Sequence, residues 1–164
     1  MKRTILYEMD PQLHRVAEPV EKITLKVRKL VEEMFETMYA AKGVGLAAPQ
    51  VGVLKRIIII DMKRRGFSPL ALVNPLITMV SGSQKNEEGC LSCPGLWASV
   101  ERAACVTVTG LNEKGCPAEL TVEGMLAAVL QHEIDHLDGI LFLDRLTPTE
   151  RVKIERQRQA VPQM

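Results

Sequence analysis

The chain has almost no net charge and no long apolar run, and each of these absences excludes a class of function. It also has only three histidines. Its 164 residues contain 21 lysines and arginines against 20 acidic residues, a formal net charge of +1. Such a balance does not indicate sequence-specific nucleic-acid binding or attachment to an anionic membrane. No apolar run approaches the roughly 20 residues that a membrane-spanning helix needs. Residues 1–6 contain no signal-like apolar region, so we expect a cytoplasmic protein.

Disulfides are not expected, although the chain contains four cysteines, because thiols stay reduced in the cytoplasm. The cysteines are therefore interpreted as metal ligands or core residues. The apolar content of 46% is typical of a globular protein, and no internal repeat or linker divides the chain. We expect a single domain over residues 1–164, in which about 147–164 form a C-terminal helix or tail.

Hydrophobic patterning and capping residues predict a helix near each end of the chain. An amphipathic helix is expected from about residue 25 to 41, with Thr24 as its cap. Gly43 stands where a left-handed glycine would end that helix. The pattern of Thr147–Glu150 is that of a capping box with proline at the first helical position, which predicts the last helix.

Between these helices the pattern favours strands in blocks. The run 57–60 is four isoleucines and predicts a buried strand, while residues 70–80 form a second extended region interrupted by Asn74-Pro75. Alternating residues on both sides of a turn at 112–115 predict a hairpin. The order favours an α+β fold: antiparallel or mixed β-sheets packed around a central helix, with an N-terminal and a C-terminal helix.

The central helix, expected from about residue 124 to 137, contains the most informative motif, Gln-His-Glu-Ile-Asp-His at 131–136. His132 and His136 are four residues apart, so both rings lie on one helix face and can bind one ion. Glu133 then lies beside that ion and can act as a general base on a bound water. The apolar run before the motif indicates a buried helix, in which these polar side chains need partners.

A catalytic metal needs a third protein ligand, and the residues leave several candidates. Phe142 stands where a metzincin has its third histidine, which excludes that class. A thermolysin-like enzyme would use a later glutamate, here Glu150 or Glu155. Cys90 and Cys93 lie in a segment that we expect to be a loop, where a ligand could be presented. Ligand rules alone leave these alternatives open.

Three segments together resemble the three motifs of bacterial peptide deformylases: 43–50 (GVGLAAPQ), 88–92 (EGCLS) and 131–137 (QHEIDHL). They occur in the order and at the spacing of that family, and the similarity covers nearly the whole chain. The resemblance implies that Cys90, His132 and His136 bind one divalent metal. It implies Fe²⁺ as the native ion, with Zn²⁺ or Ni²⁺ able to take its place, whereas ligand rules alone would favour zinc.

The resemblance also implies the activity and the catalytic residues. The enzyme would remove the formyl group from the N-terminal formylmethionine of newly synthesised proteins and release formate. Glu133 would be the general base. The side-chain amide of Gln50 and the backbone N–H of Leu91 would stabilise the oxyanion.

An apolar wall beside the metal has an argument of its own. Met125, Ala128 and Val129 precede His132 at helical spacings that place them on the ligand face. They could equally be core residues. The resemblance favours a pocket for the methionine of N-formylmethionyl peptides, with Val44 and Gly45 on the other side.

Residues beyond the ligands carry further hypotheses. Glu88 is a candidate acceptor for a ligand histidine, and Asp135 is expected to pair with Arg102. Cys93, where relatives usually have an aliphatic residue, is interpreted as a small buried hydrophobe, with a disulfide to Cys90 under oxidation as the alternative.

The C-terminal segment is basic and is expected to be a solvated helix, or one that makes a transient ribosome contact. Two rival functions remain on the residues alone. One is a metallopeptidase that uses Glu155 as its third ligand, and the other is a non-catalytic metal or thiol module.

Overall fold

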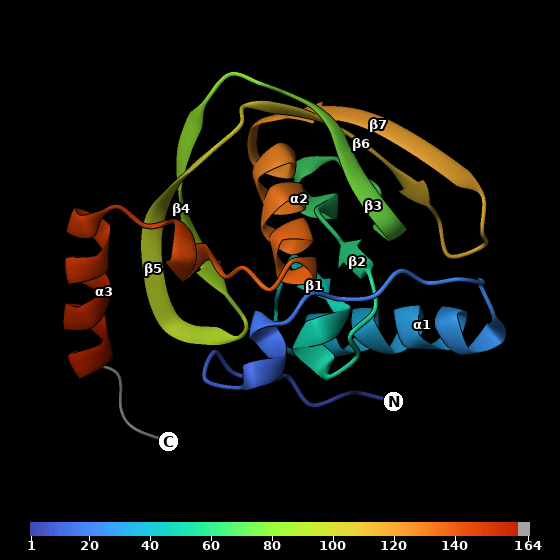
Figure 1. The fold of residues 1–164 in the computed structure, drawn as a ribbon, viewed down its shortest axis with the longest axis horizontal. Coiled ribbons are helices and arrows are strands. Elements are labelled where there is room, and N and C mark those ends of the chain that lie inside the picture. Colours follow the sequence, from blue (N-terminus) through green and yellow to red (C-terminus); the bar gives the residue numbers. More distant parts are fainter. Residues whose placement is uncertain (161–164) are drawn as a thin grey trace.

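The computed structural model describes residues 1–160, and a single helix lies at the centre of its fold (Figure 1). The helices are α1 (Leu25–Ala40), α2 (Gly124–Leu137) and α3 (Pro148–Ala160). One antiparallel sheet has the order β1 (Gly45–Ala47), β2 (Ile57–Ile60), β3 (Leu70–Ser81), β6 (Cys105–Leu111) and β7 (Pro117–Glu123). The second sheet is the antiparallel hairpin of β4 (Gln84–Cys90) and β5 (Cys93–Arg102). Short 3₁₀ helices lie at Pro11–His14, Ala48–Val51, Lys63–Arg65 and Phe142–Arg145.

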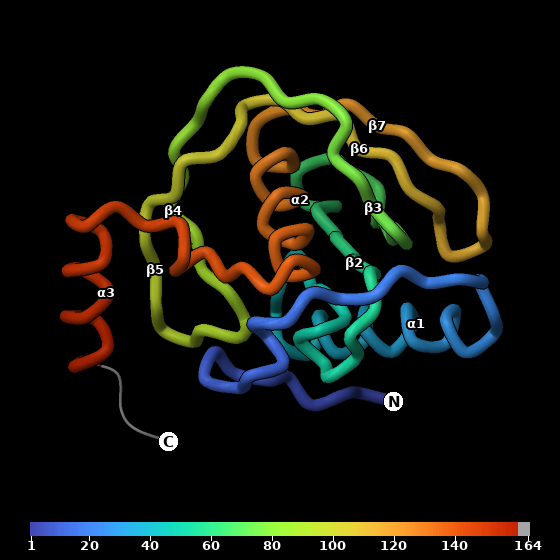
Figure 2. Tube along the Cα trace, in the orientation of Figure 1, coloured from blue at the N-terminus to red at the C-terminus, as the bar shows by residue number. Residues whose placement is uncertain are grey.

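Figures 1 and 2 show α2 between the five-stranded sheet and the β4–β5 hairpin. The predicted α+β arrangement around a central helix is therefore confirmed. None of the helices in residues 1–160 has the length and hydropathy that a bilayer crossing needs.

Strand β2 is buried on both faces, so its four isoleucines do not alternate with polar residues. Side chains of a strand point alternately to its two faces, and here both faces are covered. Ile58 and Ile60 pack in the cluster that contains the apolar face of α2, and Ile57 and Ile59 pack in the cluster that contains α1. The sheet thus holds α1 and α2 on opposite sides.

Helix α1 begins as predicted but ends differently. Thr24 Oγ1 accepts a hydrogen bond from the Val27 N–H at 3.3 Å, which caps the first turn. The left-handed residue after the helix is Lys42, with φ of 60°, so the prediction for Gly43 is wrong. A Cβ at Gly43 would lie 2.7 Å from Leu91 Cδ1. Glycine at this position lets the Leu91 side chain approach closely and is not required by its backbone angle.

The interrupted extended region is one bent strand, β3. Asn74 has φ of 53° and the pairing with β6 shifts between Val73 and Leu76. The Asn74 side chain accepts from the Val20 N–H at 2.8 Å and donates to the Val20 carbonyl at 2.9 Å. This bulge ties the N-terminal segment to the sheet.

The last helix, α3, packs on the hairpin instead of lying free in solvent. Thr147 caps it as predicted, accepting from the Glu150 N–H at 3.2 Å. The Glu150 carboxylate accepts from the Ser99 N–H of β5 at 3.2 Å, and Ile154 is buried among hairpin residues. The view of α3 as a solvated helix is therefore wrong for this face. Residues 161–164 of the expected tail lie outside the described residues.

Candidate metal centre and its surroundings

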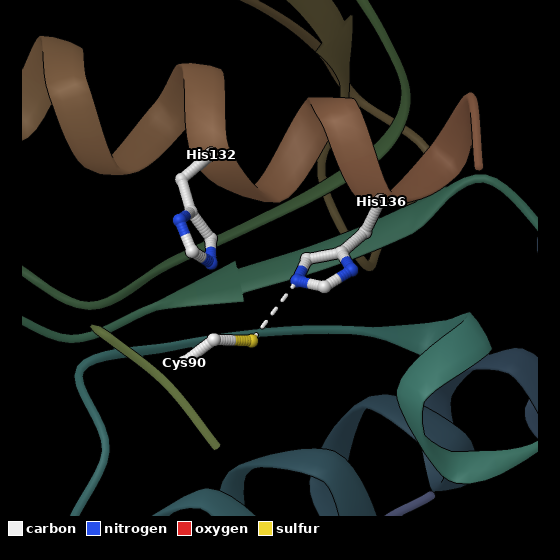
Figure 3. A group of neighbouring side chains, drawn as sticks. All are labelled: Cys90, His132 and His136. Atoms are coloured by element: carbon white, nitrogen blue, oxygen red, sulfur yellow. Dashed lines mark hydrogen bonds between the residues drawn. The ribbon is translucent and has the colours of Figure 1, made fainter. Parts of the chain in front are cut away.

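Helix α2 supplies two histidines from one face. Its opposite face is core, where Leu126, Leu130 and Ile134 pack on the five-stranded sheet. His136 comes four positions after His132, so the two rings project from the same side of the helix, as Figure 3 shows. Their centroids are 5.1 Å apart. Both histidines are buried.

Cys90 approaches these rings from the end of β4 (Figure 3). Its Sγ lies 3.4 Å from His136 Nε2, and the potential ligand atoms of Cys90, His132 and His136 all lie within 4.8 Å of one another. The predicted loop at 88–94 is wrong, because these residues form a tight hairpin in which Cys90 pairs with Cys93 across a two-residue turn. The polar sequence of β4 lacks the apolar alternation that would have indicated a strand.

The donor set fits a divalent transition metal. A hydrogen bond from the Cys93 thiol lowers the pKa of the Cys90 thiol well below its usual value, with help from both histidines and despite burial. Metals bind the thiolate form. Cys93 itself is buried in the cluster around the hairpin. Among the described residues no other group of three or more such side chains converges in this way. One thiolate and two imidazoles suit zinc, iron or nickel.

Glu133 is a buried carboxylate, and burial raises its pKa above the usual value. Within residues 1–160 its Oε1 has no hydrogen-bond partner, which is unusual for a buried polar atom. The other oxygen, Oε2, lies against Gly45, where a Cβ would be only 2.5 Å away. The space in front of Glu133 therefore exists because residue 45 has no side chain.

A network of charged side chains holds the candidate ligand His132 in place. Its Nδ1 lies 2.9 Å from Glu88 Oε1, so its Nε2 is left for a metal. Glu88 also accepts two hydrogen bonds from Arg102, at 2.8 and 2.9 Å. Burial alone would raise the pKa of Glu88, but the bonds from Arg102 and His132 outweigh it and lower the pKa.

The same network extends to a residue that sequence reasoning missed. Arg102 Nη1 donates to Asp135 at 2.6 Å, and Arg145 donates to both Asp135 oxygens, at 2.5 and 2.7 Å. The two expected contacts, of Glu88 with a candidate ligand histidine and of Asp135 with Arg102, are thus present in the structure. The contact of Glu88 with Arg102 was not expected. Arg145 had one visible signal: with Asp144, it is one of two charged residues in the otherwise apolar segment 140–146.

Gln50 is 1% exposed and its amide is fixed at both ends. Oε1 accepts from the Ala47 N–H at 2.9 Å, and Nε2 donates to Ser92 Oγ at 3.0 Å and weakly to Cys90 Sγ at 3.5 Å. Ser92 and Leu91 form the turn after Cys90. The amide nitrogen of Gln50 therefore faces Cys90, a position that only the three-motif resemblance indicated.

A cavity of about 620 Å³ opens beside these groups. All five expected pocket residues line it: Val44, Gly45, Met125, Ala128 and Val129. Gln50, Cys90, Leu91, His132 and Glu133 reach the same cavity. Glu150 and Glu155, the candidate third ligands of the rival metallopeptidase, do not line this cavity. Glu150 binds Ser99 and Lys153, and Glu155 is exposed beside Arg158.

Two histidines, a thiolate, a buried free carboxylate and an apolar cavity define a metal-dependent hydrolase. Comparison with known proteins specifies which one. Residues 2–152 match the family model of polypeptide deformylase. The peptide deformylase of Neisseria gonorrhoeae is 46% identical over 151 residues, which cover 92% of this chain and 90% of that protein.

Solved structures agree. A peptide deformylase from Legionella pneumophila superposes with a TM-score of 0.91 at 46% identity, covering 98% of this chain and 95% of that one. A peptide deformylase from Synechococcus elongatus in complex with actinonin gives 0.90 at 39% identity, covering 99% and 92%. The chain belongs to the polypeptide deformylase family. It is a metal-dependent hydrolase that removes the formyl group from nascent peptides, and the rival metallopeptidase and thiol-module functions are not favoured.

Proposed function

We propose that Cys90, His132 and His136 hold the metal of this deformylase and that Glu133 is its general base. The convergence of the three ligand groups within 4.8 Å is the observation that carries the proposal. When bound, the ion supplies Lewis acidity, which lowers the pKa of a water and polarises a carbonyl. The unpartnered Glu133 Oε1 is buried beside the ligands, in reach of a water that attacks the formyl carbon.

Glu133 moves the proton in this scheme. Its carboxylate takes a proton from the attacking water as the new C–O bond forms, and returns it to the amine as the C–N bond breaks. Formate and a free methionyl amine are the products. Burial raises the pKa of Glu133, which makes the carboxylate a stronger base than an exposed glutamate.

Gln50 and Leu91 stabilise the negative charge that develops on the formyl oxygen. The Gln50 amide is oriented by Ala47 and Ser92 before any substrate arrives, and its weak contact to Cys90 Sγ is the one that can be exchanged. The backbone N–H of Leu91 follows directly after the ligand cysteine in the hairpin turn. A donor of this kind typically contributes a factor of about 100–1,000 in kcat.

The cavity binds the first side chain of the substrate. Met125, Ala128 and Val129 continue from His132 as one apolar wall, and Val44 and Gly45 stand opposite. An unbranched thioether fills such a space well, so formylmethionine is the substrate residue we assign to it.

Glu88, Arg102 and Asp135 act behind the ligands. Glu88 accepts the Nδ1 hydrogen of His132 and thereby fixes the tautomer in which Nε2 faces the metal. Arg102 joins Glu88 to Asp135 on the same helix as the two histidines.

The native ion is Fe²⁺ in this proposal, as the family resemblance implies, with Zn²⁺ or Ni²⁺ as substitutes. Elemental analysis of protein purified without oxygen tests the identity. Activity of chelated protein after addition of each ion, under nitrogen and then in air, ranks the three.

Formate release from formyl-Met-Ala-Ser tests the activity, with and without a chelator. Cys90→Ser is expected to lose metal and activity, while Glu155→Gln, which changes an exposed carboxylate beside Arg158, keeps both. Metal-loaded protein that releases no formate would refute the function. Loss of metal in Glu155→Gln would restore the peptidase alternative.

We further propose that the chain acts as one domain in the cytoplasm, where α3 makes a transient ribosome contact. Arg151 and Arg156 are exposed on α3. Deletion of 148–164 would uncover the hairpin beneath Ile154, so charge reversal of the two arginines is the cleaner test. Unchanged co-sedimentation of the doubly reversed protein with ribosomes would exclude this surface.

A further inference from the structure

Trp97 is the only tryptophan of the chain, and it stands half exposed at the cavity mouth. Its side chain belongs to β5 but reaches across to β4. Three atoms of its six-membered ring lie 2.7–2.9 Å from the place where a Cβ of Gly89 would be. The ring face therefore covers Gly89, and any side chain at that position would push it away.

The main chain of Trp97 is fixed from outside the hairpin. Gln157 of α3 accepts from the Trp97 N–H and donates to the Trp97 carbonyl, both at 2.8 Å. The main chain of Trp97 is thus anchored and its ring packs against Gly89, while 54% of the residue is still exposed to water. An aromatic surface that is both rigid and exposed can bind another apolar group at little cost in conformational entropy.

Strand β4 has a free edge on the cavity side. In residues 1–160 it pairs only with β5, and Glu87, Glu88 and Gly89 line the cavity. An extended peptide can add to such an edge, with its side chains pointing alternately to the two faces. The inner face is that of Glu88 and its partner Ala98, which are turned toward Arg102 and the core. Trp97 and Gly89 therefore belong to the outer face.

This alternation assigns the substrate residue that meets the indole. If the methionine side chain points inward to the apolar wall, the side chain of the next residue points outward, over Gly89. We infer that Trp97 is a specificity-determining residue that receives the second side chain of the formylated peptide and favours a large apolar one, aromatic above all. This inference rests on the proposed function, because the methionine fixes the register.

The ratio of kcat/KM for formyl-Met-Phe-Ser and formyl-Met-Ala-Ser tests the inference. An aromatic contact of this kind is worth about 0.5–1.5 kcal/mol beyond burial, so we expect a preference for phenylalanine of roughly 2- to 12-fold. Trp97→Ala is expected to bring the ratio close to one, and Trp97→Phe to restore part of it. Tyr7→Ala is the matched control, since Tyr7 is also a half-exposed aromatic but does not line the cavity.

A ratio has the advantage that it does not depend on the fraction of folded or metal-loaded enzyme. A merely structural role for Trp97 would lower kcat/KM of both peptides by the same factor, and that result would overturn the inference. So would a wild-type ratio near one. Absence of formate from both peptides would instead count against the proposed function.

Fluorescence offers a second readout, because Trp97 is the sole indole. In metal-loaded Glu133→Gln, expected to bind peptides without cleaving them, formyl-Met-Phe-Ser should shift the emission more than formyl-Met-Ala-Ser at saturation. Equal shifts from the two peptides would contradict contact between the second side chain and the indole.

Discussion

Substitution of Gly45 by alanine should damage catalysis without damaging the fold. Gly45 begins β1, and no positive φ requires glycine there. The obstacle is steric: the new Cβ would lie 2.5 Å from Glu133 Oε2 and 3.0 Å from its Cδ. Ordinary contact needs about 3.5 Å, so the carboxylate has to retreat by roughly 1 Å. Displacement of a catalytic group by that amount can cost about 100-fold in rate.

The assay is formate release from formyl-Met-Ala-Ser, with metal content and thermal unfolding measured on the same sample. Gly45→Ala is expected to lose about 100-fold in kcat while keeping its metal, because Glu133 is not among the three ligand groups. Gly43→Ala is the comparison. Its Cβ would meet the end of the flexible Leu91 side chain at 2.7 Å, which can rotate away, so a smaller loss is expected. A Gly45→Ala enzyme within threefold of wild type would refute the claim that this glycine makes room for the base.

Three further predictions test the surroundings of the metal and the fold. Glu88→Gln leaves Arg102 or His132 without an acceptor, so metal affinity measured by chelator competition should fall about 10- to 100-fold, whereas the exposed Glu101→Gln should match wild type. Glu133→Gln should keep its metal and lose about 10²- to 10⁴-fold in kcat; a loss below tenfold would exclude a general-base role. Tyr39→Phe removes the hydrogen bond that the Tyr39 hydroxyl donates to Asp61. Burial, and after it this hydrogen bond, raise the pKa of Tyr39 to about 12. The same hydrogen bond lowers the pKa of Asp61. The lowered pKa of Asp61 stabilises the folded state at pH values above the unfolded pKa of about 4. The raised pKa of Tyr39 stabilises the folded state at pH values below the unfolded pKa of about 10. Between these two pH limits, the Tm of Tyr39→Phe should be about 1–2 °C below that of the wild type, a small drop because water competes for this partly exposed pair. The difference in Tm should shrink in acid and near pH 12. A difference that stays constant across pH would contradict the assignment.

The elements that the sequence predicted well are those with strong local signals. Four isoleucines in a row and an apolar run before the histidines could only be buried, and both became central elements of the core. The hairpin β4–β5 could not be predicted, because β4 has the sequence QKNEEGC. Its strand form depends on pairing with β5 and on the ion pairs of Glu88 with distant residues. Such contacts leave no periodic pattern.

The residues of the candidate site also differ in how far local sequence could predict them. His132, Glu133 and His136 follow from helical geometry alone, since their spacing fixes one shared face. Cys90 and Gln50 come from other segments, and only the three-motif resemblance pointed to them. Arg145 was missed because its function depends on Asp135, ten residues earlier, across a turn that local sequence does not describe.

Phe142, which in the sequence served only to exclude a class of enzyme, contacts His132 in the structure. Its identity excluded a metzincin, because a phenylalanine cannot ligate at the position of a third histidine. In the structure Phe142 is 1% exposed, and its ring stacks on His132, with centroids 6.1 Å apart and planes 23° from parallel. With Glu88 on Nδ1 and Phe142 on one face, the His132 ring has little freedom left. In the proposed centre, Phe142 therefore orients one ligand instead of adding another, and Cys90, at the end of β4, is the proposed third ligand.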